Sequence, residues 1–158
     1  MRKLISMACL LAATSASADV AGVYNCSASI QNVVTAGGMK YRSKTFSSSV
    51  VTLLPDGTTT SVNPISPYTS HGTYTISKSK STSKIMLTPN IFDVARDATY
   101  GCALSGASCI FVGATSTSVG TLNKAQTKIK GISKINLTLM VNEQIRVNQA
   151  TSNYTCTK

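Results

Sequence analysis

Apolar and polar side chains alternate along much of this chain, and that two-residue rhythm is the feature that most limits its fold. In the stretch 134–141, Ile135, Leu137, Leu139 and Val141 fall on one side of an extended strand. No window carries apolar residues at positions i, i+3, i+4 and i+7 over three turns, so no amphipathic helix is expected. The abundant serines and threonines also disfavour helix interiors. The pattern predicts an all-β protein.

Turn residues divide the alternating segments into short strands. The strongest turn signals are Gly37-Gly38, Pro55-Asp56-Gly57 and Asn142-Glu143, and we expect longer loops at 63–70 and 114–119. About ten antiparallel strands in one domain fit either a β-barrel or a two-sheet β-sandwich. The predicted strands are 23–34, 39–54, 72–77, 84–88, 99–104, 109–114, 119–123, 134–141, 144–149 and 154–157.

The first 18 residues have the layout of a cleavable export signal. Arg2 and Lys3 precede an apolar run at 4–13, and Ala16-Ser17-Ala18 provides small residues for cleavage. The leader is of the bacterial kind, so we expect a secreted or periplasmic protein whose single domain spans 19–158. The apolar run is too short to cross a bilayer and no later segment reaches that length, so no transmembrane segment is expected.

Four cysteines follow the leader, and an even number in a small exported chain favours two disulfides. Three pairings are possible. A two-residue turn at Ser105-Gly106 would place Cys102 opposite Cys109, which favours that bond and leaves Cys26 to pair with Cys156. With a single histidine and no Cys-x-x-Cys, a zinc site is disfavoured, and we expect neither a metal nor a cofactor.

The chain is strongly basic. It has 15 Lys and Arg against five Asp and Glu, and losing Arg2 and Lys3 with the leader lowers the net charge from +10 to +8. Such a field favours an anionic partner such as a phospholipid head group or an acidic glycan, although surface lysines can also serve only solubility. With so few aromatics, specific nucleic acid binding is not expected. The candidate ligand-binding residues form three clusters with strand spacing: Lys40, Arg42 and Lys44; Lys78, Lys80 and Lys84; and Lys124, Lys128, Lys130 and Lys134.

Catalysis has weak support in the sequence. His71 is the only histidine, so any Ser-His-Asp or Cys-His chemistry would need it, and no Gly-x-Ser-x-Gly motif supplies a nucleophile. The sequence therefore favours a non-enzymatic exported binding protein with a basic face. The two alternatives are a small secreted hydrolase built around His71 and a secreted effector or inhibitor that binds a partner protein.

Overall fold

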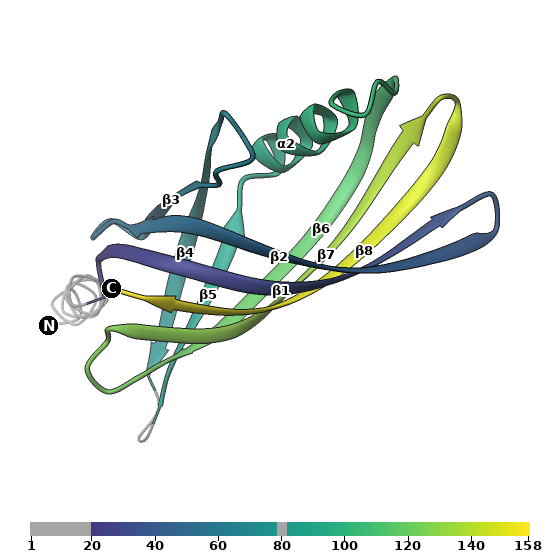
Figure 1. The fold of residues 1–158 in the computed structure, drawn as a ribbon. Coiled ribbons are helices and arrows are strands. Elements are labelled where there is room, and N and C mark those ends of the chain that lie inside the picture. Colours follow the sequence, from purple (N-terminus) through teal and green to yellow (C-terminus); the bar gives the residue numbers. More distant parts are fainter. Residues whose placement is uncertain (1–19, 79–81) are drawn as a thin grey trace, which may run out of the picture.

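The computed structural model describes residues 20–78 and 82–158. The predicted leader, 1–18, and Lys80 lie outside the described residues. Eight antiparallel strands pair in sequence order, and β1 also pairs with β8, so the sheet closes on itself (Figure 1). The elements in order are β1 Gly22–Ala36, β2 Met39–Leu53, β3 Thr58–Val62, β4 Thr69–Lys78, β5 Ser83–Pro89, α2 Ile91–Ala103, β6 Cys109–Leu122, β7 Lys128–Val141 and β8 Gln144–Thr157.

The prediction of an all-β protein with an antiparallel sheet is confirmed, but the described residues form eight strands where about ten were predicted. The predicted loop at 114–119 is wrong, because these residues continue β6 and pair with β7 on one side. The predicted strands at 144–149 and 154–157 are parts of one strand, β8. The loop predicted at 63–70 ends at Tyr68, because β4 begins at Thr69.

The predicted strand at 99–104 is also wrong, since the structure has a helix, α2, over most of this stretch. Local polar contacts explain α2. The Asn90 side chain accepts a hydrogen bond from the Phe92 backbone N–H, Asp93 lies in the first turn, and Arg96 pairs with Asp93 one turn later. None of the residues of α2 is fully buried, but Ile91, Val94, Ala95 and Ala98 recur at the spacing of one helix face, so the expectation of no amphipathic helix overlooked this stretch.

Apolar packing concentrates at the end of the barrel where β1 begins and β8 ends (Figure 1). The buried Tyr24 hydroxyl lies within hydrogen-bond distance of two carbonyl acceptors, those of Val20 (2.8 Å) and Gln126 (2.9 Å), and can donate its single proton to either. Burial, with a smaller effect of Tyr74, raises the pKa of Tyr24 to about 12. The core cluster consists of Val20, Tyr24, Leu53, Tyr74, Ile85, Leu122, Ile129 and Cys156.

Both predicted disulfide pairings are confirmed. Cys26 on β1 is bonded to its register partner Cys156 on β8, with the two Cα atoms 4.0 Å apart, so the bond joins the first and last strands. Cys102 is bonded to Cys109, with the Cα atoms 6.2 Å apart. The hairpin from which we predicted the second pairing is wrong: Cys102 lies in α2 and Cys109 begins β6.

Candidate functional site: a lysine-flanked face on three strands

The outer surface of β5, β6 and β7 carries three parallel rows of side chains set by the strand register. In the first row Lys84 lies beside Thr121, and Thr121 lies beside Lys130. Register partners on adjacent strands are about 5 Å apart, so the two ammonium groups share one side of the sheet. This juxtaposition joins a lysine of the second predicted cluster to a lysine of the third.

The second row is apolar although it faces outward. Met86 pairs with Val119, and Val119 pairs with Ile132. These side chains are 51%, 47% and 49% exposed, respectively. Three neighbouring half-exposed apolar side chains form a continuous strip across the sheet, whereas isolated ones would need no explanation.

The third row returns to basic character on β7, where Lys134 pairs with Thr117 of β6. Lys130, Ile132 and Lys134 are consecutive outward residues of one strand, so the apolar row has a lysine on each side at a spacing of about 7 Å. We call this surface the β5–β7 face, and it comprises Lys84, Met86, Val119, Lys128, Lys130, Ile132 and Lys134.

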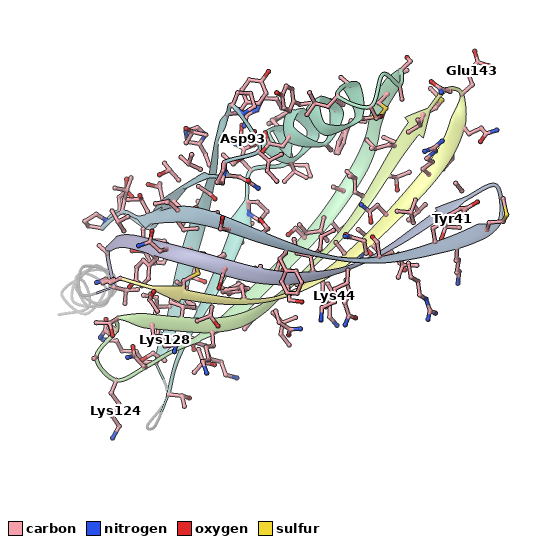
Figure 2. All side chains as sticks on the ribbon, viewed as in Figure 1. Tyr41, Lys44, Asp93, Lys124, Lys128 and Glu143 are labelled. Atoms are coloured by element: carbon pink, nitrogen blue, oxygen red, sulfur yellow. A yellow bond between two sulfur atoms is a disulfide. The ribbon has the colours of Figure 1, made fainter. Side chains whose placement is uncertain are left out.

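Among the described residues, no acid neutralises the β5–β7 face. Among residues 20–78 and 82–158 there are three ion pairs, and each involves Asp93 or Asp97 of α2. The other described acids, Asp56 and Glu143, lie in turns, after β2 and after β7. Figure 2 shows Lys124 and Lys128 on the opposite side of the molecule from Asp93 and Glu143. The lysines of the face therefore keep their full positive field.

The remaining predicted basic residues lie elsewhere. Lys40, Arg42 and Lys44 project from one face of β2, as their spacing predicts, but β2 is three strands away from β7 around the barrel. Lys44 lies 5.4 Å from the centre of the Phe46 ring, so this cluster also has an apolar neighbour. Lys124 lies in the turn between β6 and β7, and Lys78 ends β4. The structure thus brings Lys84 to the third cluster and leaves the first as a separate patch.

His71 serves a structural contact between β4 and α2. Its backbone N–H donates to Asp93 Oδ2 (2.6 Å), and its Nδ1 lies 2.9 Å from the same oxygen. The neighbouring Ser70 hydroxyl donates to Asp97 Oδ2 (2.6 Å), so serine and histidine point to different acids. A catalytic serine would instead bond to the imidazole. His71 therefore has no nucleophile bonded to it within the described part of the chain.

Arg96 completes this second charged region. Its guanidinium contacts Asp93 Oδ1 (2.9 Å) and Asp97 Oδ1 (3.1 Å), and it lies over the Tyr68 ring at 4.5 Å. Partial burial pushes the pKa of Asp93 upward, but the hydrogen bonds from His71 and the charge of Arg96 outweigh it and hold the pKa below its usual range. The charges of α2 thus pair with one another, and the two acids and one arginine leave the helix with a net charge of −1.

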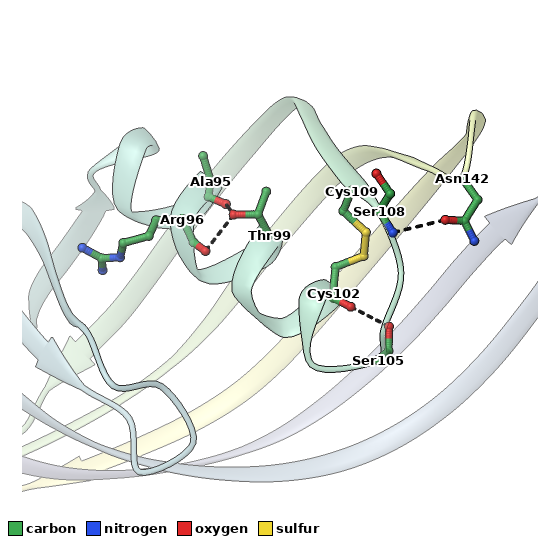
Figure 3. Close-up of a disulfide and its surroundings, with 8 residues drawn as sticks. All are labelled: Ala95, Arg96, Thr99, Cys102, Ser105, Ser108, Cys109 and Asn142. Carbon is green, nitrogen blue, oxygen red and sulfur yellow. Dashed lines mark hydrogen bonds between the residues drawn. A yellow bond between two sulfur atoms is a disulfide. The ribbon is translucent and has the colours of Figure 1, made fainter.

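The far end of α2 is held by the second disulfide (Figure 3). The Ser105 hydroxyl donates to the carbonyl of Cys102 (2.6 Å) as the chain leaves the helix. The Ser108 backbone N–H then donates to the Asn142 side chain (3.1 Å), which connects the loop to the β7–β8 turn. We call the region of His71, α2 and Cys109 the α2 side.

Sequence reasoning missed the apolar row of the β5–β7 face. Strand alternation alone places Met86 on the same side of its strand as Lys84. It likewise places Ile132 on the same side of its strand as Lys130. The signal was therefore present within each strand. The alignment of the three strands was not, because it depends on pairings across loops.

No protein-family model and no curated protein sequence matches this chain. Within residues 20–78 and 82–158, no three His, Cys, Asp or Glu side chains gather as metal ligands would. In the same residues, no helix has the length and apolar character to cross a membrane.

Proposed function

We propose that this chain is a non-enzymatic, exported binding protein that attaches to the surface of an anionic lipid bilayer through the β5–β7 face. The observation that carries the proposal is the order of the rows, in which Met86, Val119 and Ile132 lie between Lys84 and Lys130 on one side and Lys134 on the other. Lysines attract anionic head groups, and the apolar row can enter the boundary between head groups and acyl chains.

The apolar row favours a bilayer over an acidic glycan. A sulfated or carboxylated sugar chain offers charge but little apolar surface, so it would leave Met86, Val119 and Ile132 exposed after binding. A bilayer satisfies both parts of the face. An exported location belongs to this proposal and is supported by the two disulfides, which form in oxidising compartments.

Vesicle co-sedimentation at physiological salt tests the proposal. Each lysine near an anionic membrane contributes about 1 kcal/mol, so Lys130→Gln with Lys134→Gln should weaken binding to phosphatidylglycerol-containing vesicles by roughly 30-fold. The matched control is Lys40→Gln with Arg42→Gln, which removes equal charge from the separate patch on β2. The proposal is wrong if the two double variants lose the same affinity for anionic vesicles, or if the wild type does not bind these vesicles.

A second pair of variants separates lipid from glycan. Val119→Ser with Ile132→Ser keeps every lysine but removes two members of the apolar row. We expect weaker binding to anionic vesicles and unchanged binding to heparin. Equal vesicle binding by this variant and the wild type would show that charge alone is recognised.

A further inference from the structure

The barrel encloses a cavity above its packed end. The space has a volume of about 320 Å³ and is bounded below by Tyr24, Ile129 and Cys156 of the core cluster. A second hollow of about 260 Å³ shares Ser61, Ser118 and Ser133 with it and extends toward His71 and Pro89. The two are parts of one space inside the barrel.

Hydroxyl groups line this cavity in an ordered row. Ser118, Ser133 and Ser152 are register partners on β6, β7 and β8, and all three face inward. The Ser118 hydroxyl lies 3.3 Å from that of Tyr154. In the described part of the chain, the hydroxyls of Ser133 and Ser152 have no hydrogen-bond partner. Each can both donate and accept, so the row offers unused hydrogen bonds to whatever occupies the space.

The floor of the cavity is built around Tyr154. A Cβ atom at Gly120 would lie 2.8 Å from the Tyr154 hydroxyl, and one at Gly131 would meet the Tyr154 ring and the Val119 carbonyl. Only glycine at these two inward positions lets the ring lie across the sheet. A tyrosine hydroxyl, with an ordinary pKa of about 10, is protonated at neutral pH, and burial raises the pKa of Tyr154 further against the smaller opposing effect of Ser118.

From these features we infer that the barrel binds a neutral, mainly apolar small molecule that carries at least one hydroxyl or amine group. Of the residues that the structure describes, no Lys, Arg, Asp or Glu side chain lines either hollow, so a charged ligand would lose its hydration without gaining a counter-charge. Apolar walls from Leu53, Leu87, Ile129 and Ile135 match a hydrocarbon body, and the serine row matches its polar group. The volume exceeds the roughly 150 Å³ that holds benzene, which suits one or two rings.

Fluorescence titration with N-phenyl-1-naphthylamine tests this inference. The dye is neutral, so the lysines of the β5–β7 face do not attract it. We expect saturable one-to-one binding by the wild type and at least tenfold weaker binding by Ser133→Phe, which fills the cavity. Ser77→Phe places the same ring on the outer surface of β4 and should bind like the wild type. Absence of saturable binding, or equal affinity in Ser133→Phe, overturns the inference.

Methyl chemical shifts of the wild type give a readout that does not depend on a folded variant. Dye in the cavity should shift Leu87, Ile129 and Ile135, whereas dye on the outer apolar row would shift Met86, Val119 and Ile132. Shifts confined to the outer set overturn the inference. The hydroxyl row is tested by comparing naphthalene with 2-naphthol: we expect the naphthol to bind more tightly, and equal affinity would contradict a role for the serines.

Discussion

The β5–β7 face and the α2 side both carry charged residues, but they use them differently. On the α2 side Arg96 lies between Asp93 and Asp97, and His71 contacts Asp93, so each charge has a partner within about 3 Å. On the β5–β7 face lysines surround an apolar row, and no acid of the part of the chain that the structure describes forms an ion pair with them. Charge on the α2 side therefore holds one element to another, whereas charge on the face remains available to a ligand.

The disulfides allow the largest test of this difference. Cys26–Cys156 closes 130 residues and joins β1 to β8, the strand next to β7, while Cys102–Cys109 closes only seven on the α2 side. Replacing Cys26 and Cys156 with serine should lower the free energy of unfolding by about 4 kcal/mol. Replacing Cys102 and Cys109 with serine should lower it by less than about 3 kcal/mol. Urea denaturation measures both. The reverse order would contradict the account, and so would weaker vesicle binding by the Cys102→Ser, Cys109→Ser variant.

Asp93→Asn should have the next largest effect. The change removes the negative charge of the carboxylate that accepts a hydrogen bond from the His71 backbone N–H and pairs with Arg96. We therefore expect the free energy of unfolding to fall by about 2 kcal/mol. Hydrogen exchange should rise in α2, and vesicle binding should stay unchanged. Glu143→Gln is the control, because Glu143 is exposed in the β7–β8 turn. Equal losses in the two variants would show that the α2 contacts add nothing to stability.

The smallest expected effect is on the pH dependence of stability. Because the pKa of Asp93 in the folded protein lies below its ordinary value of about 3.9, its contribution is fully present above that value. The contribution is lost as the pH falls through the folded pKa. Urea midpoints from pH 6 to pH 2.5 should fall less steeply in Asp93→Asn than in the wild type. Asp56, whose pKa is lowered by hydrogen bonds from Thr58, accounts for part of the slope that remains. Identical slopes would contradict this role of Asp93.

The rhythm of the sequence was enough to predict much of the architecture. Alternation predicts the all-β fold and shows that Lys130 and Lys134 share a side of one strand, because the strand period is two whatever the surroundings. The even cysteine count predicts two disulfides. The turn at Asn142-Glu143 is also confirmed, with φ angles of 48° and 66° at the two residues.

Features that depend on contacts between distant segments could not be predicted. Lys84 lies in the same cross-strand row as Lys130 only because β6 pairs with both β5 and β7. The sequence does not show the pairing of β5 with β6, because α2 lies between these two strands in the chain. The helix did leave a signal in the sequence that the strand interpretation overlooked, because Asn90 can cap it and Ile91, Val94, Ala95 and Ala98 follow helical spacing. Four of the six residues of 114–119 are Ser or Thr, which suggested a loop when read alone, yet pairing with β7 makes the segment a strand.

The most direct test of the proposed membrane face is a label at its centre. An environment-sensitive dye is attached to the cysteine of one of two variants, Ile132→Cys or Val62→Cys. The replaced side chains are similarly exposed, 49% for Ile132 and 48% for Val62. Val62 lies on β3, away from the face, and serves as the control. On anionic vesicles we expect the label at position 132 to shift to shorter wavelength and to become protected from aqueous quencher, while the label at 62 stays unchanged. A label at 132 that remains fully accessible on bound protein, or equal shifts at both positions, would contradict the account.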